Sequence, residues 1–522
     1  MERASGILMP LFSLPSPYGI GSMGRAAYEY IDFLVAAGQK YWQLLPLGPT
    51  DLGDSPYSSP SSFAGNTNLI DLSGLAADGL ITKEFLDSFS WGEDLEKINY
   101  ELIKKNRAAV FKEAYRSFKQ REAECGEGRQ NAGNEEDNSS QTAEYAPASG
   151  AAREYNREGL RKFQEENSAW LNNYALFMAL SEKFKTPWQD WPEEIRAREP
   201  EAVARYEAEL SEIISLICFT QYLFFTQWNK LRTYAREKGI RLIGDMPVYA
   251  ASNSADVWSE PEFFKLEDDV AGVPPDAFSE EGQLWGNPIY DYEAMERDGF
   301  GWWIRRVDAA GRLYDVLRID HFRGFESYWA VPKTEKTAIN GRWVKGPGMK
   351  LVGVLTGWFN EMEFIAEDLG QITPEVHKLL CDSGLPGMKV LEFAFDASGS
   401  SAYLPHSCGE NSICYVGTHD NNTVLGWLKE LSAEDKAFAS DYMHITEDEG
   451  WAWGMIRTGM STASRLFIAQ MQDVLELPES ARMNVPGVAA GNWCWRMKEG
   501  AATKDIAARL YKYTETYRRN RT

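Results

Sequence analysis

The 522-residue sequence lacks any apolar run that approaches the roughly 20 residues of a membrane-spanning helix. Its start, MERASGILMPLF, lacks the basic, apolar and cleavage regions of a secretory signal peptide. Positive charge is also scarce: 54 Lys and Arg stand against 77 Asp and Glu, and the formal net charge is -23. Such a chain repels phosphate backbones and anionic lipid surfaces. We therefore expect a cytoplasmic protein with no nucleic-acid or membrane partner.

Cysteine and histidine are sparse as well. The six cysteines are scattered, with no C-x-x-C pair and no His at metal-ligand spacing, so we expect reduced thiols and no metal site. The segment GIGSMG, residues 19–24, has G-x-G-x-x-G spacing, but SLPSPY precedes it with two prolines, where a dinucleotide site requires a buried strand. The segment therefore does not predict a dinucleotide site.

Short apolar segments separated by helix-length stretches recur along the chain, and most of them end in acidic or polar residues. The strand candidates are YWQLLPL (41–47), RLIGDMPVY (241–249), YDVLRID (314–320), EFIAED (363–368), MKVLEFAF (388–395) and ICYVGTHD (413–420). This alternation predicts a parallel α/β sheet with both faces covered. Acidic residues at the carboxyl ends of the strands favour a (β/α)8 TIM barrel, whose active site lies at that face. A doubly wound open sheet is the alternative.

The chain is predicted to be one catalytic barrel domain, residues 1–522, with a large insertion. Residues 26–37 have helical periodicity, and Gly38 is expected to end that helix. Residues 51–237 are largely helical in pattern and interrupt the barrel after its first predicted strand. Within them, residues 121–158 carry few large apolar side chains and are expected to form a disordered loop.

The motif RIDHFRG, residues 318–324, ends one predicted strand. Side chains alternate along a strand, so Arg318 and Asp320 are expected on the same side, at the inner mouth of the barrel. The guanidinium is expected to lower the pKa of Asp320 and keep it ionised as a nucleophile. The alternative is a buried Arg–Asp pair that only holds the barrel together.

The motif FIAEDLG, residues 364–370, ends another predicted strand. Glu367 shares a side with Ile365, and apolar surroundings raise the pKa of a carboxyl, as a general acid requires. Two alternatives stay open: Asp368 is the functional residue, or both carboxylates cap the next helix.

A third acidic strand end carries Asp420, and only five His occur in the chain. Two of them, His321 and His419, adjoin Asp320 and Asp420, where they can donate hydrogen bonds to hydroxyl groups of a ligand. A fourth strand end offers Asp245, which is expected to support the site by pairing with Arg318.

In chain order, DMPVY, RIDHFRG, IAEDLG and GTHDNNT resemble the four characteristic regions of the α-amylase superfamily. A longer set of blocks resembles the 4-α-glucanotransferases, also called amylomaltases. These blocks are WQLLPLGPT (42–50), DSPYSS (54–59), GVPPDAFSEEGQLWGNPIYD (272–291), PGMKVLEFAF (386–395) and MNVPGVAAGNW (483–493). The resemblance extends from near residue 10 to near residue 496.

The resemblance implies a role for each site residue. The nucleophile falls on Asp320, the acid/base on Glu367 and the transition-state-stabilising aspartate on Asp420. The expected sugar-binding residues are Arg318, His419, Asp245, Tyr57, Trp285 and His321. Residues 272–291 resemble the family's mobile cover, on which Trp285 is expected to stack on glucose. The resemblance also implies no organic cofactor, no catalytic metal and no C-terminal β-sandwich domain.

The expected activity is transfer of a segment of a 1,4-α-glucan to the 4-hydroxyl of an acceptor, with retention of configuration. Maltooligosaccharides and α-1,4-glucans are the expected partners, and both a monomer and a homodimer remain open. A retaining α-glucan hydrolase is the nearest alternative. An inactive glucan-binding protein is another, although it would be expected to lack Asp320 or Glu367.

Overall fold

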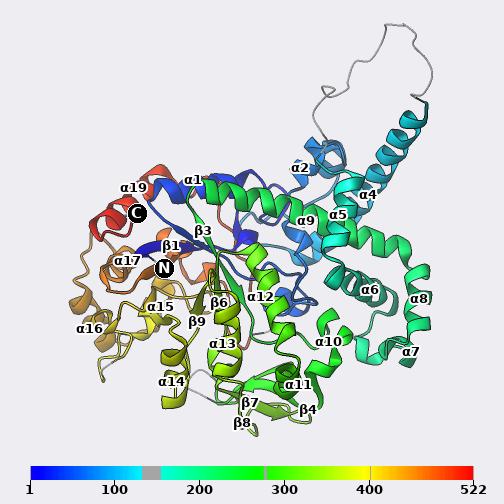
Figure 1. The fold of residues 1–522 in the computed structure, drawn as a ribbon. Helices are drawn as coiled ribbons and strands as arrows, with labels where there is room; N and C mark the ends of the chain where they lie inside the picture. The colour runs from blue at the N-terminus through cyan, green and yellow to red at the C-terminus, as the bar shows by residue number, and fades with distance from the viewer. Residues whose placement is uncertain (1, 132–153, 276–278, 400, 489, 521–522) are drawn as a thin grey trace, which may run out of the picture.

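Eight parallel strands form the centre of the fold (Figure 1). The structure is a computed structural model that describes residues 2–131, 154–275, 279–399, 401–488 and 490–520. The strands lie in the order β10-β11-β12-β1-β2-β3-β6-β9. Their bounds are β1 Ala4–Leu8, β2 Tyr41–Gln43, β3 Arg241–Met246, β6 Val316–Ile319, β9 Glu363–Ala366, β10 Gly387–Val390, β11 Ser412–Tyr415 and β12 Leu466–Gln470.

The sheet closes between β9 and β10. The amide of Ala366 donates to the carbonyl of Pro386 at 3.0 Å, and the amide of Met388 donates to Oδ1 of Asp368 at 2.6 Å. The (β/α)8 barrel is therefore confirmed and the open sheet excluded. The six predicted strands correspond to β2, β3, β6, β9, β10 and β11, whereas β1 and β12 were not predicted.

Helices surround the strands (Figure 1). Their bounds are α1 Arg25–Ala36, α12 Gly301–Leu313, α13 Met349–Trp358, α14 Pro374–Ser383, α15 Val424–Glu430, α16 Ala433–Met443, α17 Trp451–Ser461 and α19 Lys504–Thr516. Helix α1 ends where predicted, because Gly38 takes a φ of 70° that favours glycine. Helix α19 packs beside α1 near the end of the chain, where Nε2 of Gln39 donates to Oγ1 of Thr514 at 2.9 Å.

The connection from β2 to β3 holds the helices that lie beside the barrel on the right of Figure 1. Their bounds are α2 Leu72–Ala77, α3 Lys83–Asp87, α4 Tyr100–Asn131, α5 Arg157–Glu166, α6 Ser168–Phe184, α7 Glu193–Arg196, α8 Pro200–Glu209 and α9 Ser211–Glu237. Helix α9 also reaches the barrel, since Nε1 of Trp228 donates to the carbonyl of Leu313 at 3.2 Å. The inserted helices are thus anchored by a helix that also packs against the barrel.

The predicted disordered loop, residues 121–158, needs correction at its ends. Residues 121–131 continue α4, and α5 begins at Arg157, where Oδ1 of Asn156 accepts from the amide of Gly159 at 2.9 Å. Residues 132–153 lie outside the described residues. A count of large apolar side chains does not detect residues with good helix propensity, such as Arg121 and Glu122.

A second, antiparallel sheet adjoins the barrel at the bottom of Figure 1, in the order β5-β4-β7-β8. Its strands are β4 Phe264–Val273, β5 Gln283–Tyr290, β7 Ser327–Pro332 and β8 Arg342–Lys345. The predicted cover loop 272–291 is therefore mostly wrong as a loop, because 283–290 form β5 and pair with β4, which in turn pairs with β7. Residues 276–278 of that segment lie outside the described residues.

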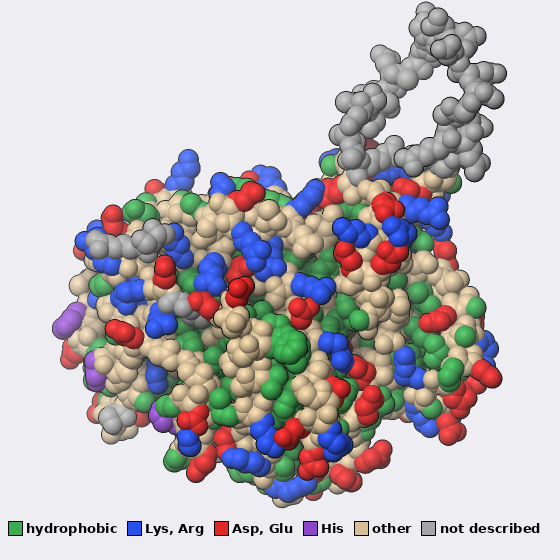
Figure 2. Space-filling view, viewed as in Figure 1, with side chains coloured by type: hydrophobic (Ala, Val, Ile, Leu, Met, Phe, Trp, Pro, Cys, Tyr) green, Lys and Arg blue, Asp and Glu red, His purple; other side chains and the backbone are tan. Residues whose placement is uncertain are grey.

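On the face shown in Figure 2, acidic and basic side chains are interspersed. Within the described ranges, no single helix is long and apolar enough to cross a membrane. Helices α8 and α9 reach that length and composition only as a pair, across a bend of 80°.

Candidate active site

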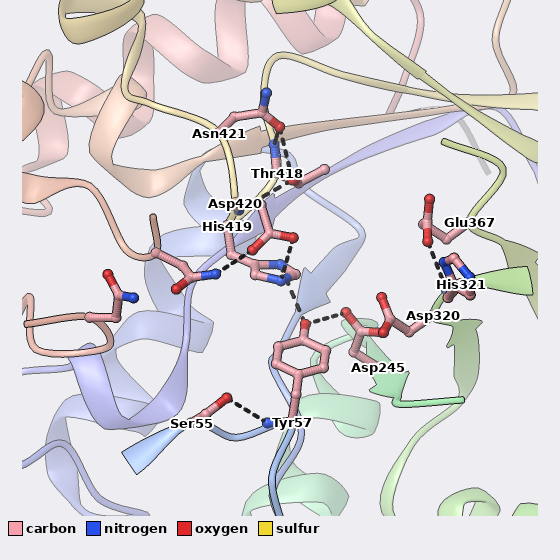
Figure 3. Close-up of polar contacts among 12 residues, drawn as sticks. Ser55, Tyr57, Asp245, Asp320, His321, Glu367, Thr418, His419, Asp420 and Asn421 are labelled. Atoms are coloured by element: carbon pink, nitrogen blue, oxygen red, sulfur yellow. Dashed lines mark hydrogen bonds and ion pairs between the residues drawn. The ribbon is translucent and has the colours of Figure 1, made fainter. Parts of the chain in front are cut away.

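The predicted functional side chains meet at the carboxyl ends of the barrel strands (Figure 3). Asp245 lies in β3, Arg318 in β6 with Asp320 just beyond it, and Glu367 directly follows β9. The loop after β11 carries His419 and Asp420, and Tyr57 comes from the loop after β2. Because parallel strands all end at one face of a barrel, residues far apart in sequence come together there.

A buried ion pair lies at the base of the site. Nη1 of Arg318 donates to Oδ1 and Oδ2 of Asp245, both at 2.6 Å, and the two side chains are only 3% and 0% exposed. The same Nη1 donates to Oδ1 of Asp320 at 3.0 Å. Arg318 and Asp320 thus point to the same side, as the strand alternation predicts. The purely structural alternative fits Asp245 better than Asp320, whose side chain is 26% exposed.

Replacing Asp245 with alanine is expected to lower the free energy of unfolding by about 3–5 kcal/mol, because it leaves the buried Arg318 cation without its main partner. Chemical denaturation monitored by Trp fluorescence measures this loss. Asp308→Ala is the matched control, since its pair with Arg312 is 53% exposed on the Asp308 side and is worth about 0–1 kcal/mol. Equal losses in the two variants would contradict the importance of the buried pair.

The pKa of Asp320 differs from the expectation based on the sequence. Burial raises the pKa of Asp320 well above its ordinary value, and although Arg318 lowers that pKa, the charges of Asp245, Glu367 and Asp420 raise it. The prediction of a lowered pKa is therefore wrong. One guanidinium that already pairs with Asp245 does not outweigh burial and three neighbouring carboxylates.

Glu367 is 8% exposed, and burial raises its pKa as predicted. Its surroundings are not purely apolar, however. Oε2 accepts from the amide of His321 at 2.7 Å and Oε1 accepts from the amide of Leu369 at 2.7 Å. These bonds stabilise the carboxylate and limit the rise in pKa. They also fix both oxygens of Glu367 relative to the backbone beside Asp320.

Asp368 has a different place from Glu367. Its Oδ1 accepts from the amide of Met388, and a Cβ on Gly387 would lie 2.7 Å from its Oδ2. It therefore joins β9 to β10. The following helix, α14, is capped by Oγ1 of Thr373. The structure thus supports neither alternative for the FIAEDLG motif, that is, neither a functional Asp368 nor a helix cap formed by both carboxylates.

Tyr57 and His419 form a stacked pair over Asp245, with ring centroids 5.0 Å apart. Oη of Tyr57 donates to Oδ2 of Asp245 at 2.8 Å and lies 3.4 Å from Nδ1 of His419 (Figure 3). Burial lowers the pKa of His419, so its imidazole is neutral near pH 7. A neutral ring keeps one N–H donor and one acceptor.

Asp420 is the most open of the three carboxylates, with a side chain 45% exposed. Its Oδ2 lies 3.4 Å from Nε2 of His419, and its Oδ1 accepts from Nδ2 of Asn484 at 2.6 Å. Arg482 holds the backbone below it, donating from Nη2 to the carbonyl of Asp420 at 2.7 Å. Sequence reasoning missed Asn484 and Arg482 as site residues, although Asn484 belongs to the block MNVPGVAAGNW.

His321 and Trp285 form the wall of the site next to the second sheet. Their rings meet edge to face with centroids 4.9 Å apart, and Trp285 is 36% exposed. His321 takes a φ of 49°, which turns the chain sharply after Asp320. Burial lowers the pKa of His321 to about 3, so it too is neutral. The structure thus brings all nine predicted site residues to one end of the barrel.

The arrangement places two buried acids, Asp320 and Glu367, at the ends of the adjacent strands β6 and β9, with Asp420 across the mouth. Burial raises the pKa of both acids, and the charge of Glu367 raises that of Asp320 further. Protonation of Glu367 therefore favours the ionised form of Asp320, as the acid and nucleophile roles require. Among the described residues, no group of three or more His, Cys, Asp or Glu side chains is placed to hold a metal ion.

Comparison with known proteins gives a consistent result. A family model described as 4-alpha-glucanotransferase matches residues 9–503. The 4-alpha-glucanotransferase of Clostridium butyricum is 44% identical over 519 residues, covering 98% of this chain and 100% of that protein. That of Thermus thermophilus is 43% identical over 532 residues, covering 99% of each. The amylomaltase from Streptococcus agalactiae, solved with acarbose, superposes with a TM-score of 0.90 at 40% identity, covering 99% of this chain and 100% of that one.

Proposed function

Because the chain belongs to the 4-alpha-glucanotransferase family and is a glucan-transferring enzyme, we propose that Asp320, Glu367 and Asp420 perform the transfer by a retaining double displacement. One observation carries this proposal. The amide of His321, the residue after Asp320, donates to Oε2 of Glu367 at 2.7 Å. The backbone next to the nucleophile therefore also fixes the position of the acid/base.

In the first step a carboxylate oxygen of Asp320 attacks the anomeric carbon of the donor glucan. The bond from that carbon to the glucosidic oxygen breaks, and Glu367 gives its proton to the departing oxygen. The leaving segment departs with a new 4-hydroxyl, and a glucosyl ester remains on Asp320. Retention requires the two carboxyl groups to lie roughly 5–5.5 Å apart when substrate is bound.

In the second step the 4-hydroxyl of an acceptor attacks the same carbon and displaces Asp320. Glu367, now ionised, takes the hydroxyl proton and returns to its starting state. Burial favours the protonated form of Glu367 before the first step, and the amides of His321 and Leu369 stabilise its anion between the steps. Two inversions at the anomeric carbon restore its original configuration.

The other residues hold the sugar at the cleavage point. Asp420 is placed to hydrogen-bond sugar hydroxyls and stabilise positive charge on the ring in the transition state. The neutral His321 and His419 donate hydrogen bonds, and Trp285 offers an exposed ring face for stacking. Arg318, Asp245 and Tyr57 form the base on which the nucleophile and His419 rest.

We also propose that the substrates are maltooligosaccharides and longer α-1,4-glucans. The related Streptococcus agalactiae enzyme was solved with acarbose. From the scattered cysteines and the acidic composition, we propose a cytoplasmic enzyme.

Incubation of the enzyme with maltotriose alone tests segment transfer. The expected products are glucose and a ladder of chains longer than maltotriose, because an acceptor hydroxyl resolves the glucosyl ester. Chromatography of the products over time distinguishes the outcomes, with boiled enzyme as the control. Production of only glucose and maltose would contradict the proposal and indicate a hydrolase.

A further inference from the structure

Two buried carboxyls, Glu392 and Asp473, lie behind the loop that carries Asp420, and the mechanism above uses neither. Glu392 is 8% exposed and follows β10, and Asp473 is 1% exposed and lies in α18, Met471–Val474, directly after β12. Strands β10 and β12 flank β11 in the barrel. Both acids therefore approach residues 416–423, which leave β11 and include Asp420.

The two acids contact opposite ends of this loop. The amide of Glu392 donates to the carbonyl of Val416 at 3.2 Å. At the far end, the amide of Val424 donates to Oδ1 of Asp473 at 2.8 Å. These two hydrogen bonds thus hold both ends of the loop that carries Asp420.

The Glu392 side chain packs directly against the middle of the loop. A Cβ on Gly417 would lie 2.7 Å from Oε1 of Glu392, so only glycine allows this approach. Asn421 hydrogen-bonds the Glu392 carboxyl, while its Oδ1 accepts from the amide and Oγ1 of Thr418 at 3.0 and 2.9 Å. Glu392 therefore supports the turn from Thr418 to Asn421 that holds Asp420.

The surroundings of Glu392 do not suit an anion. Oε1 of Glu392 and Oδ2 of Asp473 are both buried without a hydrogen-bond partner among the described residues. Burial raises the pKa of Glu392 well above its ordinary value. The charges of Asp473 and Glu430 raise the pKa of Glu392 further, whereas Arg482 and the hydrogen bond from Asn421 lower it. A second negative charge here would be buried, unpaired and repelled.

We propose that Glu392 is a positioning residue that works as an uncharged carboxyl: it fills the space beneath Gly417 and, through Asn421, holds Asp420 in place. This inference rests on the proposed role of Asp420. Ionisation of Glu392 would push its carboxylate away from Asp473 and disturb the turn above it.

The sign of the pH effect on stability follows from proton uptake. In the folded protein Glu392 keeps a proton that the unfolded chain releases above about pH 4.5. The contribution of Glu392 to stability therefore falls as pH rises from there towards the pKa of Glu392 in the folded protein. Glutamine has the same shape but no proton to lose, so Glu392→Gln removes this contribution, while that of Asp473, whose pKa burial raises to about 7, remains.

The test compares Glu392→Gln and Glu392→Ala with wild type in transfer from maltotriose and in Tm, from about pH 6 to about pH 9. We expect Glu392→Gln to keep wild-type turnover near neutral pH and to gain Tm relative to wild type as pH rises. Glu392→Ala should lose about 10- to 100-fold in kcat with a smaller change in KM, because Asp420 is displaced. Glu434→Gln, an exposed acid in the first turn of α16, is the control for the change in net charge.

A Glu392→Gln variant as impaired as Glu392→Ala at every pH would overturn the proposal, since charge rather than shape would then be needed. Comparison with Asp420→Asn separates the two claims. If Asp420→Asn is inactive while Glu392→Ala turns over normally, only the positioning role fails. If Asp420→Asn keeps wild-type turnover, the proposed role of Asp420 fails and the positioning role fails with it. The comparison of Tm between wild type and Glu392→Gln across pH tests the uncharged state of Glu392 whatever the activity results are. It does not require Glu392→Ala to fold.

Discussion

Replacing Asp320 with asparagine is expected to reduce transfer from maltotriose by on the order of 10⁴-fold or more, because the amide cannot form the glucosyl ester. The change keeps the size of the side chain and leaves the 2.6 Å contacts between Arg318 and Asp245 in place. The fold should therefore persist. Initial rates with maltotriose, together with circular dichroism of the variant, measure both effects.

The control for this variant is Asp308→Asn, which removes an exposed carboxylate from α12 and should retain wild-type rates. A donor with an excellent leaving group, such as maltosyl fluoride, should not restore the Asp320 variant. Turnover of Asp320→Asn within about tenfold of wild type would assign the nucleophile to another residue.

Replacing Glu367 with glutamine is expected to lower transfer from maltotriose by about 10²- to 10⁴-fold, because the leaving oxygen then departs without a proton. Maltosyl fluoride needs no such proton, so formation of the glucosyl ester should persist with this donor. Azide, which attacks without a general base, should then accelerate its breakdown. Rates with both donors, measured with and without azide, test the assignment.

A matched control is Glu361→Gln, an exposed acid just before β9. The wild-type rate should also fall at high pH as Glu367 ionises, because the acid must hold its proton in the first step. If the fluoride donor is as slow as maltotriose with Glu367→Gln, the general-acid role is wrong.

The barrel was predictable because its strands are short apolar segments that end in polar residues. Strands such as β6 and β9 are buried and finish at Asp320 and Glu367, which gives a local signal at each site position. Strands β1 and β12 lack an acidic residue there: β1 ends in Leu8, and β12 ends in Gln470, which is polar but not acidic. Their sequences ASGIL and LFIAQ run into Met9 and Met471, and only their pairing with β2 and β11 places them in the barrel.

Electrostatics was less predictable than position. The sequence correctly placed Arg318 beside Asp320 and Asp245, but the sign of the pKa shift depends on all charges and on burial together. Hydrogen bonds from the backbone were equally hidden, as with the two amides that bind Glu367. The net pKa shift follows only from the folded structure, because each contribution to it changes steeply with distance and solvent exposure.

Supporting residues were missed for a related reason. Asn484 and Arg482 reach Asp420 across more than 60 residues of sequence, and Glu392 reaches the same loop from β10. Arg482 and Asn484 lie outside the predicted strands, and Glu392 lies in the apolar segment MKVLEFAF with no second polar residue beside it. Their roles follow from the packing of loops at the barrel mouth, which residue spacing does not specify.

The most direct test of the mechanism is to trap the glucosyl ester and locate it. Glu367→Gln incubated with maltosyl fluoride should accumulate the ester, because its formation needs no acid and its breakdown lacks a base. After rapid quenching and proteolysis, mass spectrometry should find the maltosyl adduct on the peptide that contains Asp320, with fragmentation placing it on that side chain. An adduct on a different carboxylate, or turnover with no adduct and an inverted product, would contradict the double displacement at Asp320.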